Sequence, residues 1–275
     1  MRSYFLFVIC FFILLLDFYC YKAIIGSFKN WSLKVKKNFG IIWWTFNSLL
    51  IIGVFAAIHM TDDYKHKGAR KKLIELLASK GITDARVLTA MQAIPRHFFF
   101  STTFHSHAYE DKAFPIGEGQ TISQPYTVAY QTQVLHVVKG DKILEIGTGS
   151  GYQAAVLMQM GATLYSIERH EILSKRASVL LQKMGYTPIL KCGDGTKGWT
   201  EKAPFDKIIV TAGAPVVPET LVAQLKIGGI MVIPVGDDKR QKMLSIIKTG
   251  EQTIETIELD YFAFVPLIGE KGWKK

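Results

Sequence analysis

The chain has 275 residues, of which 49% are hydrophobic and 20% charged, and its formal net charge is +10. This length fits one ordinary domain with an appendage, or two small domains, and the composition is globular without low-complexity tracts. We expect no nucleic-acid partner, because half of the excess charge lies in the first forty residues and the other lysines are not interleaved with aromatic side chains. Cys192 is the only cysteine after residue 60, so we expect neither a disulfide framework nor a metal site.

Residues 1–59 form an apolar and basic N-terminal extension. The apolar run 4–16 is short for a bilayer span of roughly 20 residues, whereas the run 41–58 is long enough. If both runs crossed, the basic loop between them would be cytoplasmic and the following domain would lie outside the cytoplasm. Two explanations remain open. Either only 41–58 inserts and tethers a cytosolic domain to the inner face of a membrane, or the residues before Met60 are an upstream extension of the reading frame.

We favour the second explanation, with a cytoplasmic domain over residues 60–275. Membrane association would then depend on whether residues 4–58 are present in the mature protein. Mass spectrometry of the native N-terminus distinguishes the two explanations.

From residue 60 onward, the spacing of apolar residues predicts helices first and then alternating strands and helices. A helix over 66–79 ends at Gly81, and a second helix begins at the N-cap Thr83 and ends before Pro95. After a polar connector, we expect strands over 142–146, 163–167, 188–191, 206–210, 229–234, 243–248 and 253–259, and helices over 152–160, 172–184 and 218–225. This order predicts an α/β fold, a doubly wound and mostly parallel sheet with antiparallel C-terminal edge strands. A ligand should bind beyond the C-terminal ends of the first strands.

A glycine loop follows the strand predicted over 142–146. Gly147, Gly149 and Gly151 let the chain turn tightly and let the backbone approach a ligand closely, although any strand–helix turn has similar needs. The spacing is G-x-G-x-G, with Tyr152 at the position where a dinucleotide site has its third glycine. This departure disfavours NAD.

Three acidic residues follow or end successive predicted strands around this loop. Glu168 is placed to accept hydrogen bonds from ribose hydroxyls, Asp194 from an adenine amino group, and Glu145 from an ammonium group. One such acid is more often a loop cap, but three around one glycine loop indicate a nucleoside that carries positive charge. We therefore predict S-adenosyl-L-methionine as the cofactor. The predicted cofactor-binding residues are Glu145, Gly147, Thr148, Gly149, Gly151, Glu168, Asp194 and Gly195.

Short motifs outside the loop resemble one family along almost all of residues 66–273. The most discriminating is Gly119–Pro125, which reads G-Q-T-I-S-Q-P and precedes the first predicted strand. The others are V-L-T-A-M (87–91), I-P-R-H (94–97), A-Y-E-D (108–111), P-I-G (115–117), G-D-G (193–195), P-F-D (204–206) and F-V-P-L (264–267). Through these residues the chain resembles the protein-L-isoaspartate O-methyltransferases, class I enzymes that use S-adenosyl-L-methionine. It departs from them at Ala113-Phe114, where a leucine commonly precedes the proline, and in its apolar N-terminus.

The resemblance implies the Rossmann-like methyltransferase fold and a protein-repair reaction. The methyl group of S-adenosyl-L-methionine would move to the free carboxylate of L-isoaspartyl residues in damaged proteins and peptides, and the ester would collapse to a succinimide. The resemblance also implies Ser123 as the active-site residue, and we expect Thr121, Ile122 and Gln124 to contact the substrate. We expect a cytoplasmic monomer whose partners are isoaspartyl proteins and peptides.

The chemistry of this transfer makes modest demands on the side chains. A carboxylate is already ionised near neutral pH, so no strong general base is required. The site must supply position, a dry pocket and hydrogen-bond donors. The hydroxyls of Thr121 and Ser123 are such donors, although Ser123 also fits as the cap of a helix that begins at Pro125.

Two other functions are compatible with the fold. The first is a methyltransferase acting on a small molecule or a nucleic acid. It would carry base-stacking aromatic residues, such as an N-P-P-[FYW] run, after the fourth strand, where this chain has Val210-Thr211-Ala212-Gly213-Ala214-Pro215. A membrane-tethered binding module would keep the fold without catalysis. Methyl incorporation into an isoaspartyl peptide distinguishes both from the repair enzyme.

Overall fold

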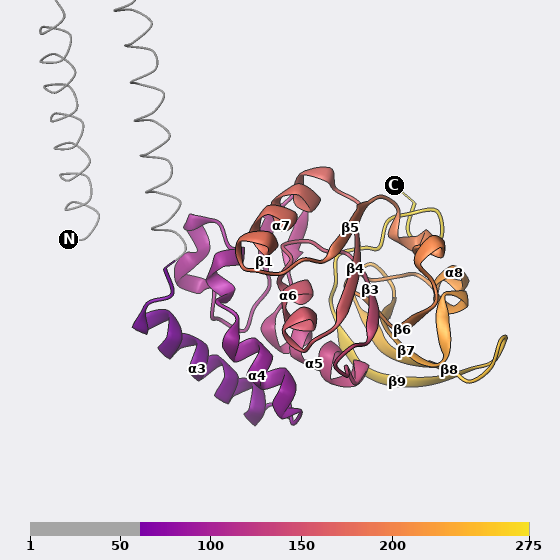
Figure 1. Cartoon of the computed structure of the whole chain (residues 1–275), viewed down its shortest axis with the longest axis horizontal. Coiled ribbons are helices and arrows are strands. Elements are labelled where there is room, and N and C mark those ends of the chain that lie inside the picture. The colour runs from indigo at the N-terminus through magenta and orange to yellow at the C-terminus, as the bar shows by residue number, and fades with distance from the viewer. Residues whose placement is uncertain (1–60, 275) are drawn as a thin grey trace, which may run out of the picture. The chain divides into compact units, whose positions relative to one another are not determined.

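The computed structural model describes residues 61–274 (Figure 1). The predictions for residues 1–59, including the membrane-spanning alternative, lie outside these residues. Within the described part, no helix is both long enough and apolar enough to cross a membrane.

A seven-stranded sheet forms the centre of this part, in the order β5-β4-β3-β6-β7-β8-β9. Its strands are β3 Lys142–Ile146, β4 Thr163–Glu168, β5 Ile189–Cys192, β6 Phe205–Val210, β7 Leu225–Gly236, β8 Gln241–Lys248 and β9 Ile254–Phe262. The pairs from β5 through β7 are parallel, whereas β8 is antiparallel to both of its neighbours. The predicted sheet with its antiparallel edge is therefore confirmed.

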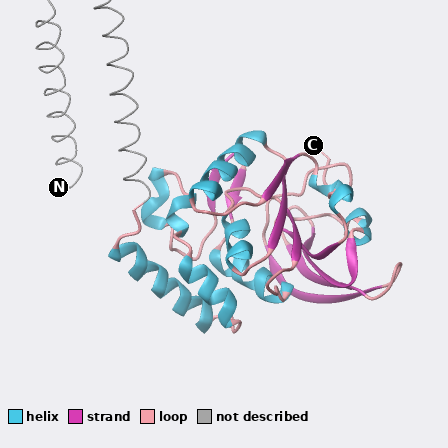
Figure 2. Cartoon of the chain, in the orientation of Figure 1, coloured by secondary structure: helices cyan, strands magenta, loops and turns pink. Residues whose placement is uncertain are grey.

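Helices lie on both sides of the sheet (Figure 2). They are α3 Tyr64–Ser79, α4 Ala85–Ala93, α5 Pro125–Leu135, α6 Tyr152–Gln159, α7 Glu171–Lys183 and α8 Glu219–Ala223. Successive residues of β3 point to opposite faces: Ile143 belongs to the apolar core shared with α5, α6 and α7, and Leu144 to the core shared with α8. Because both faces are covered, this strand after Lys142 is an apolar run interrupted only by Glu145, which is fully buried.

Most helix boundaries lie within two residues of the sequence prediction, and two of the differences have a clear physical reason. The N-cap of α4 is Asp84 and not Thr83, because the Asp84 carboxylate accepts a hydrogen bond of 2.9 Å from a main-chain amide in the first turn. The helix predicted over 218–225 ends at Ala223, because Leu225 already pairs with β6 in the sheet.

The segment predicted as a polar connector contains regular structure. It holds a short hairpin of β1 Phe114–Gly117 and β2 Gln120–Ile122, followed by α5. Helix α5 lacks a clear apolar stripe because Gln131 and Thr132 are buried with their polar groups bonded. The Gln131 side-chain amide donates to the main-chain carbonyl of Val210 at 2.9 Å, which ties α5 to β6. Apolar spacing alone therefore could not reveal this helix.

Candidate active site

A pocket lies at the C-terminal ends of β3, β4 and β6. The predicted cofactor residues that line it are Gly147, Thr148, Gly149, Glu168 and Gly195. The other wall carries the segment after β1, of which Thr121, Ile122 and Ser123 line the pocket. The structure thus brings the glycine loop and the G-Q-T-I-S-Q-P segment to the same cavity, at the sheet edge where doubly wound folds bind ligands.

Gly147 and Gly151 have different structural roles in the loop. Gly147 has a φ of +98°, and a β-carbon added there would overlap the hydroxyl of Thr211. That hydroxyl donates to the carbonyl of Gly147 at 2.7 Å. This bond ties the glycine turn after β3 to the residue that follows β6. Gly151 has a φ of +88° and does not line the pocket; its missing side chain lets the start of α6 pack against Leu181 of α7. Gly147 shapes the pocket, and Gly151 shapes the helix packing behind it.

Glu168 ends β4 and lines the pocket as predicted. Its Oε2 accepts a hydrogen bond of 2.8 Å from the amide of Gly149, and its Oε1 accepts one of 2.9 Å from the amide of His170. Each carboxylate oxygen can accept a further bond. The side chain is therefore fixed in orientation and keeps acceptor capacity, which is what a pair of ribose hydroxyls requires.

Asp194 is placed beside the pocket and does not line it, although its neighbour Gly195 does. Its carboxylate accepts bonds from the amide and the hydroxyl of Thr196, at 2.9 and 2.7 Å, and from the amide of Glu270 at 2.8 Å. Burial alone would raise the pKa of Asp194, but these hydrogen bonds hold it below its usual value. Asp194 thus ties the C-terminal segment to the pocket rim, and its predicted contact with adenine remains a prediction.

Glu145 lies behind the pocket and not in its wall. Its Oε2 accepts a bond of 2.5 Å from the hydroxyl of Ser166, which is 2.6 Å from the hydroxyl of the pocket residue Thr148. Its Oε1 has no partner among residues 61–274, and burial raises the pKa of Glu145 to about 8. Glu145 is therefore mostly protonated near neutral pH in this structure, and two hydroxyls link it to the pocket wall.

A second pocket of about 530 Å³ adjoins the first, a volume typical of ligand sites. Four residues line both pockets: Thr121, Ser123, Thr211 and Val265. Gln124 lines only the second pocket. Ser123, the predicted active-site residue, and Thr121, a predicted substrate contact, therefore lie where the two cavities meet.

The turn that carries Ser123 is held by a buried arginine that sequence reasoning did not single out. Arg96 is fully buried; its Nε donates to the carbonyl of Ala108 at 3.0 Å, and its Nη2 donates to the carbonyl of Ser123 at 2.8 Å. The guanidinium lies 4.5 Å from the ring centroid of Tyr152, and burial lowers the pKa of Arg96 to about 10. Ser123 itself does not cap α5, whose N-cap is Gln124 without a side-chain bond.

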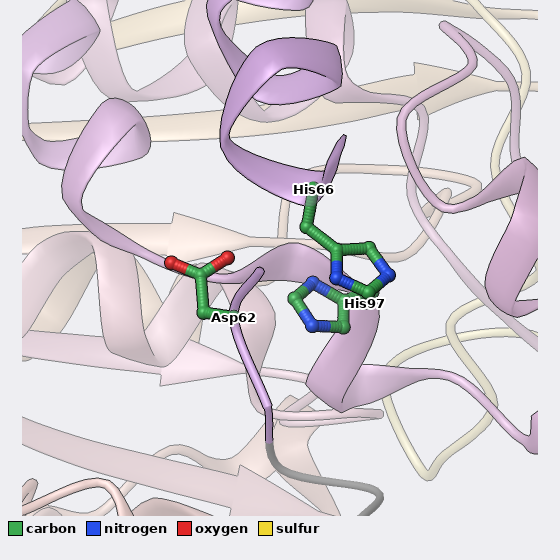
Figure 3. A group of neighbouring side chains, drawn as sticks. All are labelled: Asp62, His66 and His97. Carbon is green, nitrogen blue, oxygen red and sulfur yellow. The ribbon is translucent and has the colours of Figure 1, made fainter. Parts of the chain in front are cut away.

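One group of side chains in the described residues has the composition of a metal site. Asp62, His66 and His97 place their ligand atoms within 4.8 Å of one another (Figure 3). The two imidazole rings are stacked, with centroids 3.8 Å apart and planes 8° apart, so their in-plane lone pairs do not converge on one ion. Both carboxylate oxygens of Asp62 accept bonds from Arg70. This geometry favours a hydrogen-bonded packing cluster.

A doubly wound sheet with an antiparallel edge, a G-x-G-x-G loop after β3 and an acid at the end of β4 fit the class of S-adenosylmethionine-dependent methyltransferases. The family of protein-L-isoaspartate(D-aspartate) O-methyltransferases matches residues 68–272, and the chain belongs to that family.

Relatives and solved structures agree with this assignment. Proteins named protein-L-isoaspartate O-methyltransferase from Cytophaga hutchinsonii and Flavobacterium psychrophilum are 54% and 55% identical over 214 residues, which is 78% of this chain and 97% and 100% of theirs. A solved protein-L-isoaspartate O-methyltransferase is 31% identical with a TM-score of 0.67, over 74% of this chain and 67% of its own. A structure from Plasmodium falciparum in complex with S-adenosyl-L-homocysteine is 25% identical with a TM-score of 0.64, over 72% of this chain and 98% of its own.

Proposed function

We propose that the protein is a repair methyltransferase that moves the methyl group of S-adenosyl-L-methionine to the free carboxylate of L-isoaspartyl residues in damaged proteins and peptides. The observation that carries this proposal is the position of Ser123 and Thr121 at the junction of the two pockets. The match of residues 68–272 to the family supports the substrate class.

The residues of the first pocket fit the cofactor. When bound, S-adenosyl-L-methionine supplies a methyl group made electrophilic by its sulfonium. Glu168 would accept hydrogen bonds from the cofactor's ribose hydroxyls, and the main chain of Gly147 and Gly149 would allow its close approach. Hydrogen bonds through the hydroxyls of Ser166 and Thr148 connect the buried Glu145 side chain to the pocket wall. We assign Gly151, Asp194 and Gly195 to the cofactor site as supports of its loop and rim.

The residues of the second pocket position the substrate. The hydroxyls of Ser123 and Thr121 donate to one oxygen of the isoaspartyl carboxylate, so that the other oxygen faces the methyl group. Gln124 holds the adjacent peptide backbone in this pocket, and we assign Ile122, which lines the first pocket, to the same substrate contact. No side chain has to remove a proton, because the carboxylate is ionised near neutral pH. Catalysis therefore rests on orientation and on exclusion of water.

The ester product then leaves the site and reacts without the enzyme. The backbone amide nitrogen after the modified residue attacks the ester carbonyl, loses its proton, and releases methanol, which closes a succinimide ring. Water opens this ring in part to a normal aspartyl linkage. The enzyme's own contribution to repair is thus methylation of the carboxylate. A carboxylate oxygen is a poor leaving group, whereas the ester can lose methanol.

We further propose that residues 60–275 form the catalytic domain and that it acts as a cytoplasmic monomer on isoaspartyl proteins. The family match within this range and the unpaired Cys192 support the proposal. A chain that begins at Met60 should retain full methyl transfer. Light scattering after size-exclusion chromatography should give the mass of a monomer. Activity found only in the membrane fraction would favour the alternative, a tether formed by residues 41–58.

The proposed activity is tested with methyl-labelled S-adenosyl-L-methionine and two peptides that differ only in an L-isoaspartyl or a normal aspartyl residue. Label should enter the isoaspartyl peptide as a base-labile ester that releases methanol. Cofactor binding without incorporation would instead favour a non-catalytic binding module.

A further inference from the structure

The second pocket reaches a cationic side chain outside the cofactor pocket. Arg240 lines the second pocket and not the first, whereas Thr121 and Ser123 line both. Arg240 directly precedes β8, and Tyr261 of β9, opposite Lys242, lines the same pocket. A charge is therefore placed at a distance from the reacting atoms, within the cavity that receives the substrate.

The Arg240 guanidinium is held over an aromatic ring. Its Cζ lies 4.1 Å from the ring centroid of Tyr261. The main chain is fixed as well, because the Asp237 carboxylate accepts hydrogen bonds from the amides of Lys239 and Arg240 at 2.8 and 2.7 Å. A guanidinium that rests on a ring keeps its N–H donors at its edge, available to a planar acceptor.

These donors have no carboxylate partner within residues 61–274 at ion-pair distance. Lys242 is the instructive contrast: its ammonium lies 4.8 Å from the same ring centroid, but it pairs with Glu258 at 2.8 Å. Of the two cations against Tyr261, only Arg240 lines the pocket and keeps its charge uncompensated by a neighbouring acid.

We propose that Arg240 and Tyr261 form a subsite for an acidic side chain of the substrate, on a residue close in sequence to the isoaspartyl residue. This inference rests on the proposed function. The reacting carboxylate must lie at Thr121 and Ser123, where the pockets meet, so Arg240 binds a second carboxylate of the same peptide. An arginine binds a carboxylate through two parallel hydrogen bonds, which adds orientation to charge.

The test compares pairs of isoaspartyl peptides that differ only in Glu or Gln at a single position. Four positions are varied in turn, the two before and the two after the isoaspartyl residue. With the full chain, Glu at one of these positions should raise kcat/KM about two- to fivefold over Gln, as expected for a solvent-exposed ion pair. The ratio should fall towards one at high salt. Arg240→Gln should bring it to one at low salt, and Arg240→Lys should retain part of it.

Lys239→Gln is the matched control, because it removes the same charge from an adjacent residue that does not line the pocket. It should retain the preference for Glu. Equal rates for Glu and Gln at every position, a ratio that survives in Arg240→Gln, or a ratio lost equally in Lys239→Gln would overturn the subsite and leave the proposed function intact. Failure to methylate any isoaspartyl peptide, including those with Gln, would contradict the proposed function and the subsite together.

Discussion

The guanidinium of Arg96 donates a hydrogen bond of 2.8 Å to the main-chain carbonyl of Ser123. A fully buried charge thus holds the turn that presents the Ser123 hydroxyl at the junction of the two pockets. The same guanidinium also binds the carbonyl of Ala108, so it couples the segment before β1 to the segment after β2. Under the proposed function, orientation of the substrate carboxylate would therefore depend on a residue outside both pockets.

Replacement of Arg96 tests this coupling. Arg96→Met leaves the carbonyls of Ala108 and Ser123 without donors, and each unsatisfied buried group costs roughly 1–3 kcal/mol. We expect a lower free energy of unfolding in urea, and a larger loss of methyl transfer than of S-adenosyl-L-homocysteine affinity. Arg86→Met is the control, because it removes a more exposed arginine that pairs with Asp84 and donates to the carbonyl of Val137, away from both pockets. It should cost some stability and leave turnover unchanged. Unchanged turnover in Arg96→Met would refute the positioning role.

Ser123→Ala tests the donor itself. One lost hydrogen bond to the carboxylate should reduce kcat on an isoaspartyl peptide by about tenfold, since net hydrogen bonds contribute about 1 kcal/mol and those to charged groups more. The dissociation constant of S-adenosyl-L-homocysteine, measured by calorimetry, should stay near that of the wild type. A variant with wild-type kcat would show that the Ser123 hydroxyl has no part in the reaction.

Gly147→Ala tests the shape of the cofactor pocket. The new methyl group would overlap the Thr211 hydroxyl, and a φ of +98° adds strain of about 1–3 kcal/mol. We expect S-adenosyl-L-homocysteine to bind at least about tenfold more weakly, since each 1.4 kcal/mol is tenfold in affinity. Gly185→Ala is the control: its φ is +84°, but nothing lies within 4 Å of the new carbon. It should lose stability and keep its cofactor affinity.

The raised pKa of Glu145 leads us to expect that the free energy of unfolding depends on pH. Its pKa is about 8 in the folded protein because of burial, against 4.5 for an unperturbed glutamate. The folded state therefore binds this proton more tightly, so the contribution of Glu145 to stability is full below pH 4.5 and is lost as the pH rises to about 8. The slope is at most about 1.4 kcal/mol per pH unit.

Glu145→Gln removes this titration. Urea unfolding of the cofactor-free wild type and variant should show that the variant gains stability relative to the wild type as the pH is raised from 5 to about 8. Parallel curves for the two proteins across this range would show that Glu145 is ionised in the folded state throughout.

The sequence predicted most of the parallel sheet because its strands are short apolar runs separated by helices with a clear stripe. It could not reveal α5, in which Gln131 and Thr132 are buried through hydrogen bonds made far along the chain. Of the predicted cofactor acids, Glu168 lines the pocket, whereas Glu145 lies behind it. Position along the strands explains this difference. Glu145 is level with Ser166, two residues before Glu168, so Glu145 lies inside the sheet and Glu168 at its C-terminal edge.

The residues that the sequence missed act through tertiary contacts. Thr211 lines the pocket because β6 pairs with β3, which brings its hydroxyl to the glycine loop. The sequence does not show this pairing. Nothing in the sequence assigns a role to Arg96 beyond its place in the I-P-R-H motif, or any role to Arg240. Their environments, a sealed core for one and an aromatic ring in a pocket for the other, depend on segments distant in the chain.

The central claim is methyl transfer to an isoaspartyl carboxylate followed by repair. Mass spectrometry of an L-isoaspartyl peptide incubated with the full chain and S-adenosyl-L-methionine tests it most directly. We expect, in order, a methyl ester, a succinimide formed with loss of methanol, and accumulation of the normal aspartyl peptide over repeated cycles. A peptide that stays unmodified under conditions in which the protein binds S-adenosyl-L-homocysteine would contradict the proposed repair activity.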